Sequence, residues 1–184
     1  MINLALFSSM LLLIAYTIIA IYNSLIKKSK LTEEAWSGVD VLLKKRYDLI
    51  PSIVDTVKAY SKHEKETLAE IVHLRNIYNQ NSSIKDKAQQ NNEVSQALKS
   101  IFALSENYPD LKANQSFLDL QNNLNEIEEQ IQLAKRYYNA TVRDYNILVE
   151  MFPSNLIANK FGFISKDFYE LSREEERENI KISF

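Results

Sequence analysis

The chain has 184 residues and a formal net charge of −2, and it contains no cysteine, two glycines and three prolines. So few glycines and prolines argue against β-hairpins and glycine-rich phosphate loops and favour an all-α protein. The lack of cysteine excludes disulfides, thiolate zinc sites and cysteine nucleophiles. The nearly balanced charge supplies no basic face, so nucleic acid is not expected as a partner.

The N-terminal segment, residues 1–26, carries no charged side chain. About 20 apolar residues cross the hydrocarbon core of a bilayer as a helix, so the stretch from Ile2 to Tyr22 is long enough to span it. A cleaved signal peptide is the weaker interpretation, because no basic residue precedes the apolar run and no small-residue cleavage site follows it. We therefore predict a transmembrane anchor over residues 1–26, in contact with the lipid bilayer.

Three lysines directly after this anchor predict its orientation. Under the positive-inside rule, basic residues that flank a span remain in the cytoplasm. The rule places the rest of the chain on the cytoplasmic side of the membrane. These lysines are Lys27, Lys28 and Lys30.

Residues 27–162 repeat apolar side chains at helical spacing, which predicts amphipathic helices. Arg46 lies within the first apolar stripe. Pro51 interrupts the same stretch and predicts either a kink or a reversal of the chain. The polar residues around 79–83 predict a loop, and a further helix is expected over residues 86–105.

The segment SENYPDLKANQSF, residues 105–117, predicts a sharp corner between two helices. Pro109 disfavours the helical conformation at Tyr108, so a helix should end there. Asp110 and Asn114 can cap the helix that begins next.

Residues 113–151 contain neither proline nor glycine and predict one long helix. Its apolar residues step by threes and fours, the spacing of a bundle or coiled-coil seam, which a single helix cannot bury. Pro153 ends this helix. The predicted seam consists of Phe117, Leu120, Leu124, Ile127, Ile131, Ala134, Tyr138, Val142, Tyr145, Val149 and Phe152.

The stretch NLIANKFGF, which follows Pro153, predicts a short apolar segment that packs on the end of the bundle or rests on the membrane. A membrane-shaping wedge is the weaker interpretation, because Asn155, Asn159 and Lys160 leave only a small apolar face. The charged tail over residues 163–184 is expected to be poorly ordered. The sequence thus predicts one transmembrane helix followed by an antiparallel up-and-down bundle of three to four long helices.

Several blocks of the sequence, in order, resemble the LemA family of bacterial membrane proteins. They are EAWSGVDVLLKKRYDLIPSIVDTVKAY followed by HE, then ENYPDLKAN, YYNATVRDYN and MFPSNLIA. The resemblance extends over nearly the whole chain, including the anchor and the final ISF, and departs in the acidic tail after Phe168. It implies an up-and-down helical bundle on a single span of the bacterial inner membrane, with the N-terminus outside. It also implies a link to envelope homeostasis, without a settled biochemical activity.

Charged residues of the family pattern predict an ion pair inside the bundle. Burying Arg46 or Glu128 alone would be costly, so each needs a partner. We predict that an arginine, Arg46 or Arg75, pairs with a carboxylate across helices and sets their register. Glu128 and Glu106 are the candidate carboxylates, and extension of the arginine to solvent is the alternative. The polar residues that match the pattern are Asp40, Arg46, Asp48, Glu64, Arg75, Glu106, Glu128, Arg136, Asn139 and Asn146.

Aromatic and amide residues on the long helix supply further candidates. Tyr138 and Tyr145 lie on the seam and are expected in the core. Tyr137 faces elsewhere and is a candidate for a partner-binding surface. Asn139 and Asn146 are a heptad apart and are candidates for a polar ladder to a neighbouring helix or a partner.

Metal and catalytic motifs are incomplete. Glu70 and His73 have the E-x-x-H spacing of di-iron bundles, but His63 has Tyr60 where a second motif needs its acid. No serine stands in a strand-turn-helix elbow. We therefore expect no metal, no cofactor and no catalytic residue.

Two functions fit these patterns. The first is a non-catalytic scaffold or adaptor that recruits an unidentified protein, or a second copy of the chain, at the membrane. The alternative is a ligand-binding or enzymatic site formed by buried carboxylates and arginines in the bundle core.

Overall fold

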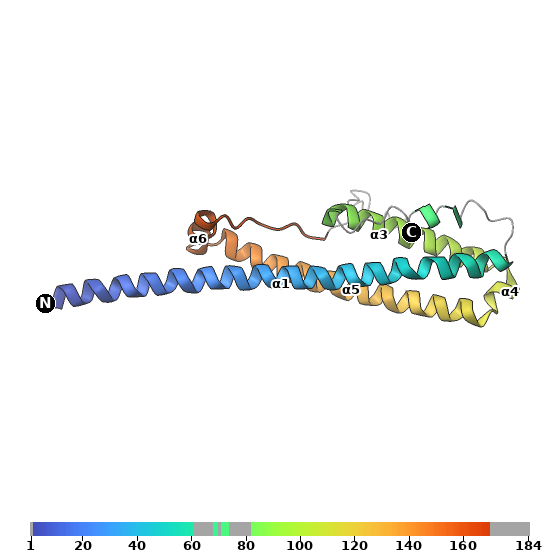
Figure 1. Cartoon of the computed structure of the whole chain (residues 1–184), viewed down its shortest axis with the longest axis horizontal. Coiled ribbons are helices and arrows are strands. Elements are labelled where there is room, and N and C mark those ends of the chain that lie inside the picture. Colours follow the sequence, from blue (N-terminus) through green and yellow to red (C-terminus); the bar gives the residue numbers. More distant parts are fainter. Residues whose placement is uncertain (1, 61–67, 70, 74–81, 170–184) are drawn as a thin grey trace, which may run out of the picture. The chain divides into compact units, whose positions relative to one another are not determined.

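The computed structural model describes residues 2–60, 68–69, 71–73 and 82–169. The described chain is helical, with no strand in these ranges, which confirms the predicted all-α class. The helices are α1 (Ile2–Tyr60), α3 (Ile84–Ser105), α4 (Pro109–Lys112), α5 (Gln115–Glu150) and α6 (Ser154–Phe161) (Figure 1).

The chain forms two compact units, and the boundary between them falls within α1 and within α5. The first unit takes residues up to Val39 together with Ala134–Phe168, and so includes α6. The second takes Asp40–Leu133, with α3 and α4, and Tyr169. Each unit therefore builds its own helix contacts from a different part of α1 and α5.

Helix α1 continues across the predicted end of the anchor at residue 26 and across Pro51. Proline cannot donate to the carbonyl four residues earlier, and it usually bends or ends a helix. Here Ile50 and Ile53, on either side of it, are fully buried, and this packing holds the backbone helical. The chain does not reverse at Pro51. Of the two alternatives that the sequence left open there, the reversal is wrong.

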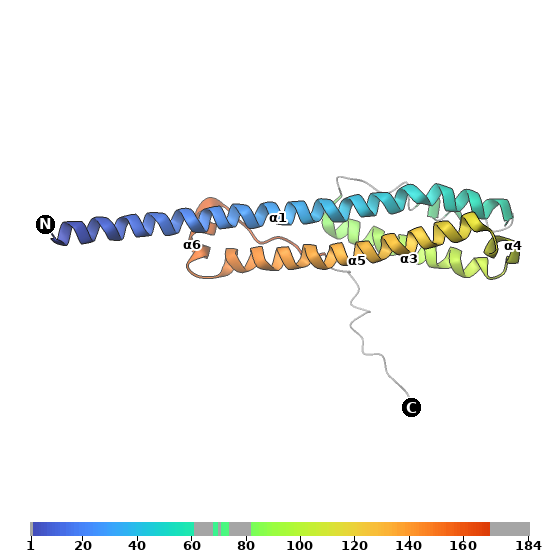
Figure 2. The same ribbon diagram turned by 90° about the horizontal axis from the view of Figure 1, so that it is seen from below.

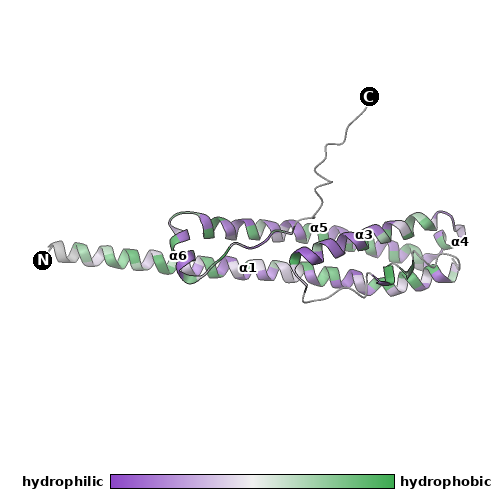
Figure 3. Cartoon of the chain, turned by 90° about the horizontal axis from the view of Figure 1, so that it is seen from above, coloured by the Kyte–Doolittle hydropathy of each residue, from purple (hydrophilic) through white to green (hydrophobic). Residues whose placement is uncertain are grey.

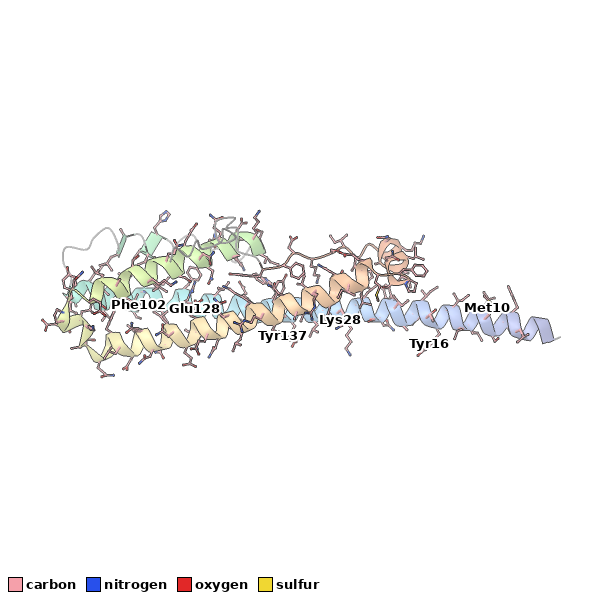
Figure 4. All side chains as sticks on the ribbon, turned by 180° about the vertical axis from the view of Figure 1, so that it is seen from behind. Met10, Tyr16, Lys28, Phe102, Glu128 and Tyr137 are labelled. Carbon is pink, nitrogen blue, oxygen red and sulfur yellow. The ribbon has the colours of Figure 1, made fainter. Side chains whose placement is uncertain are left out.

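The first part of α1 is an exposed apolar rod. Every side chain from Leu6 to Ala20 is exposed, and α1 contains a stretch apolar enough and long enough to span a membrane. Figure 3 shows this part as apolar or weakly polar, and in Figure 4 Met10 and Tyr16 project from it without a neighbouring helix. These properties are consistent with membrane anchoring.

In the second unit α1 and α5 run in opposite directions. Arg46 of α1 contacts Glu128 of α5, whereas Tyr60, further along α1, contacts Asn114 just before α5 begins. The partner numbers fall as the α1 numbers rise, which is the register of an antiparallel pair.

Helix α3 runs parallel to α1 in the same unit. Asp40 contacts Lys87, and Arg46 contacts Ser95, so both sets of numbers rise together. With α5 antiparallel to α1, these directions fit the predicted up-and-down bundle.

The corner between α3 and α5 contains the short helix α4. Tyr108 precedes α4 and Pro109 is its first residue. The first residue of a helix has no intrahelical partner for its N–H, so a proline costs no hydrogen bond there. Asn114 then caps α5, because its Oδ1 accepts a hydrogen bond from the Phe117 backbone N–H at 3.0 Å. The corner thus has the proline stop and the asparagine cap that the sequence predicts.

The apolar seam of α5 is buried over most of its length. Leu120 and Ala134 are half-buried, and Phe152 is 73% exposed because α5 ends at Glu150, so its place in the predicted seam is wrong. The buried members are Phe117, Leu124, Ile127, Ile131, Tyr138, Val142, Tyr145 and Val149.

Helix α6 folds back beside α1 in the first unit (Figure 2). Its Ala158 packs with Leu25 of α1 and Val149 of α5. Gly162 ends α6 with φ of 74°, a left-handed conformation that glycine adopts without strain. This turn directs residues 163–168 back along the unit.

The start of the charged tail differs from its prediction. Weak order is expected from residue 163, but Phe163 packs on the first unit and Tyr169 is buried in the second. Apolar rings and specific hydrogen bonds hold this stretch in place. Residues 170–184, the remainder of that predicted tail, lie outside the described residues.

Candidate functional site

Arg46, on α1, is the centre of a polar cluster inside the second unit. Its side chain is 1% exposed. Nη1 donates to Glu128 Oε2 at 2.5 Å and to Ser95 Oγ at 2.9 Å. Nη2 donates to the carbonyl oxygen and Oδ1 of Asn91, at 2.8 and 2.6 Å. Three helices therefore meet at one guanidinium.

The electrostatics of the cluster are asymmetric. Burial lowers the pKa of Arg46 and the Glu128 carboxylate opposes this, so the guanidinium remains charged. The Glu128 side chain is 37% exposed and also accepts a hydrogen bond from Gln132 at 2.7 Å. Removing the carboxylate would leave a buried charge, whereas removing the arginine would leave a carboxylate that water can reach.

Two buried tyrosines lie in the field of Arg46. Burial raises the pKa of Tyr47 to about 12, although the arginine opposes the shift. Burial also raises the pKa of Tyr169, with the same opposition. Neither phenol ionises at neutral pH, so both contribute neutral rings and hydroxyls around the guanidinium.

We expect the stability of the fold to decrease between pH 10 and 12. A tyrosine whose pKa is higher in the fold than in the unfolded chain stabilises fully below about pH 10, and this contribution disappears as pH rises through the folded value. Tyr47→Phe should shift the unfolding midpoint, followed by circular dichroism, to higher pH. Tyr137→Phe, at an exposed position, should leave it unchanged. An unchanged midpoint for Tyr47→Phe would contradict this prediction.

A second buried cation supports the same pair of helices. Lys87 of α3 is 2% exposed at its side chain and donates to Asp40 of α1 at 2.5 Å. This pair and the Arg46 cluster fix α3 against α1 at two levels. A slip of either helix by one residue would separate both pairs, which is how they set the register.

The other predicted charges lie elsewhere. Glu106 ends α3 and pairs with Lys112 of α4, where both side chains are exposed. Asp48 and Arg136 are exposed. The predictions that involve Glu64, Arg75 and Glu70 with His63 fall on residues outside those described.

Sequence reasoning missed Asn91, Ser95 and Lys87. Asn91 and Ser95 are four residues apart, and both lie next to the buried Val94 on the surface of α3. This spacing was the one signal in the sequence that they face the core. The surrounding segment is rich in Gln and Asn, which made it resemble a solvated face. Their role as hydrogen-bond acceptors becomes clear only from the position of Arg46 opposite them.

The first unit has a polar contact of its own around Lys166. Its Nζ donates to the carbonyl oxygen and Oγ of Ser29, both at 3.0 Å, and to Thr32 Oγ1 at 2.5 Å. Asn146 holds the same residue by its backbone, since its amide accepts from the Lys166 N–H and donates to the Lys166 carbonyl, both at 2.9 Å. Asn146 thus binds the extended segment after α6. The polar ladder from Asn139 and Asn146 to a neighbouring helix or a partner stays a prediction, and Asn139 is half-buried.

Lys166→Ala should destabilise the first unit by about 1–3 kcal/mol, because hydrogen bonds from a charged donor are stronger than neutral ones. The measurement is the thermal midpoint of the full chain in detergent micelles. Lys160→Ala is the matched control, since Lys160 is exposed on α6. Equal midpoints for the two variants would show that the Lys166 contacts do not hold the segment.

Adjacent tyrosines on α5 have opposite environments. Tyr138 is 2% exposed, its ring lies 5.4 Å from that of Trp36, and its hydroxyl donates to the Asp167 carbonyl at 2.9 Å. Tyr137 is 54% exposed. The structure therefore places Tyr138 in the core of the unit and Tyr137 on its surface.

Within the described ranges, no group of three or more His, Asp or Glu side chains is placed to hold a metal ion. The shifted pKa values of Arg46, Tyr47 and Tyr169 arise at the polar cluster of the second unit. The chemistry of the cluster is thus that of a charge-assisted clamp between helices.

The LemA family model matches residues 35–184. The chain belongs to the LemA family. This confirms the resemblance found in the sequence blocks, and the match includes the acidic tail, which the sequence had led us to set apart. The apolar first part of α1 precedes the matched range.

A relative from Metamycoplasma hominis supports this membership. The chain is 27% identical to "Protein LemA" of that organism over 165 residues, which cover 88% of this chain and 74% of the relative.

Proposed function

We propose that this LemA-family chain is a non-catalytic scaffold or adaptor, tethered by α1 to the bacterial inner membrane. The apolar rod from Leu6 to Ala20 sets its location, and the helical units present surfaces to proteins that act in the cell envelope. Lys27 and Lys30, exposed after the rod, favour a cytoplasmic position for the units.

The Arg46 cluster is the observation that carries this proposal. A ligand site built on Arg46 would need guanidinium nitrogens that are open to a ligand. Instead the two terminal nitrogens of Arg46 make four hydrogen bonds to Glu128, Ser95 and Asn91. The buried arginine is already used to join three helices, which favours the scaffold over the alternative of a ligand-binding or enzymatic core.

Tyr137 is the candidate contact for a protein partner. It is a large, half-exposed aromatic on α5 in the first unit, beside a buried tyrosine that fixes the orientation of the helix. Aromatic side chains are enriched at protein interfaces because they bury much area with little loss of conformational freedom.

The experiment replaces Tyr137 with a photo-crosslinking amino acid in the full chain, in its native membrane. Ser100, exposed on α3, is the control position. The scaffold predicts a discrete cross-linked protein from position 137 and none from position 100, and Tyr137→Ser should weaken recovery of that protein at least about tenfold. Cross-links to a second copy alone would show self-association, and no cross-link from 137 would contradict a partner surface there.

A further inference from the structure

The environment of α1 changes sharply where the apolar rod ends. Side chains from Leu6 to Ala20 are exposed, Ile21 and Tyr22 are half-buried, and Leu25 is fully buried. The helix thus passes within five residues from a surface suited to lipid to a surface covered by protein.

Helix α6, Phe163 directly after it and the end of α5 supply that protein cover. The Tyr22 ring meets the Phe161 ring edge-on at 4.8 Å and the Phe163 ring at 5.8 Å. Leu25 packs against Ala158. Helix α6 therefore lies at the level of α1 where the rod ends, as Figures 1 and 2 both show.

Charge places this level at the membrane surface. The first charged residue, Lys27, follows Tyr22 by five positions, or about 7.5 Å of helix. The headgroup layer on each side of a bilayer is about 5–7 Å thick. If the rod spans, Tyr22 and the side of α6 that touches it lie in this layer.

Large apolar side chains remain exposed around α6 at this end of the first unit. Beyond the contact with Tyr22, 56% of Phe161 is exposed. Single exposed apolar residues are ordinary, but a group beside a membrane span marks an interaction surface. We name this group the α6 collar, and it consists of Met151, Phe152, Leu156, Phe161 and Ile164, which are 54%, 73%, 61%, 56% and 76% exposed.

We propose that the α6 collar inserts into the headgroup and acyl-chain boundary of the leaflet from which α1 emerges. The occupant is lipid, because the collar continues the surface of the spanning rod through the Tyr22–Phe161 contact. Lys160, exposed on the same short helix, supplies a cation for lipid phosphates. The first unit is thereby held against the bilayer by two elements, the rod and the collar. This inference rests on the membrane anchoring proposed above.

From the sequence, the polar residues Asn155, Asn159 and Lys160 leave α6 itself with only a small apolar face. The collar is larger because only Leu156 and Phe161 belong to α6, while Met151 and Phe152 precede it and Ile164 follows it. All five lie in α6 or in the turns directly before and after it.

Depth-dependent quenching of tryptophan fluorescence tests the collar. The chain has one tryptophan, so Trp36→Phe provides a silent background for the full chain in phosphatidylcholine vesicles with a minor share of phosphatidylglycerol. Single tryptophans replace Leu156 in the collar, Tyr16 in the rod and Tyr137 on α5. Tyr137 is the matched control, since it is exposed and lies about 20 Å along α5 from Glu150.

Leu156→Trp should lose at least about half of its emission to lipids brominated near the headgroup. Tyr16→Trp should be quenched most by lipids brominated deep in the chains, and Tyr137→Trp by neither. Quenching at 16 without quenching at 156 would overturn the collar and leave the span intact. No quenching at 16 would overturn the span and the collar together, and quenching at 137 would show a unit lying flat on the bilayer, contrary to the proposal.

Discussion

Glu128→Gln should lower the free energy of unfolding by about 2–3 kcal/mol, and the melting temperature by about 5–10 °C. The substitution leaves Arg46 charged, 1% exposed and without its carboxylate. Breaking a fully buried pair costs about 3–5 kcal/mol, and the smaller figure reflects the 37% exposure of Glu128, through which water can reach the arginine.

Arg46→Met should be less damaging than Glu128→Gln. Methionine is apolar and unbranched and can fill the space of the buried stem, while Glu128 can turn to solvent. The double variant, Arg46→Met with Glu128→Gln, should be more stable than Glu128→Gln alone, because it no longer contains a buried unpaired charge.

Thermal melts of the full chain in detergent, followed by circular dichroism, measure these three variants. Glu129→Gln is the matched control, since Glu129 is exposed beside Glu128 on α5, and it should change the melting temperature by little. If the double variant melts at the sum of the two single losses, Arg46 and Glu128 do not interact across the helices.

Tyr138→Ala should destabilise the first unit by about 3–5 kcal/mol, the usual cost of deleting a large buried ring. It removes the contact with Trp36 and the hydrogen bond to the Asp167 carbonyl. Tyr137→Ala, one residue away, should stay within about 0.5 kcal/mol of the parent because its ring is half-exposed.

The fluorescence of Trp36 measures the first of these effects locally. In Tyr138→Ala its emission should move to longer wavelength at temperatures where the parent is folded, since the indole loses its cover. In Tyr137→Ala the spectrum should match that of the parent. Equal losses for the two variants would show that α5 does not present the seam as described.

Periodicity was enough to predict the helices and the seam of α5. The steps of three and four residues from Phe117 to Val149 need only one property, apolarity at regular spacing, and eight of those positions are buried. The pattern failed at Phe152, where spacing continues but the helix has already ended at Glu150.

Pro51 shows where local rules give way to packing. A proline removes one backbone hydrogen bond, which sequence can foresee, but whether neighbouring side chains compensate depends on contacts far along the chain. Fully buried Ile50 and Ile53 provide that compensation here.

Polar partners were predictable only in part. The sequence indicates that Arg46 needs a partner and includes Glu128 among the candidates, because an arginine in an apolar stripe is costly alone. It could not indicate Asn91 or the Asn146 contact with Lys166, since an amide carries no charge and its role depends on what the fold places opposite it.

The most direct test of a retained membrane tether is the intact mass of the chain recovered from washed bacterial membranes. Membranes are washed with high salt and then with alkaline carbonate, and the intact mass of the protein that remains is measured by mass spectrometry. A retained anchor predicts a chain that stays in the pellet with residues 1–26 present. A chain released to the supernatant, or one that lacks these residues, would contradict membrane tethering and with it the proposed scaffold.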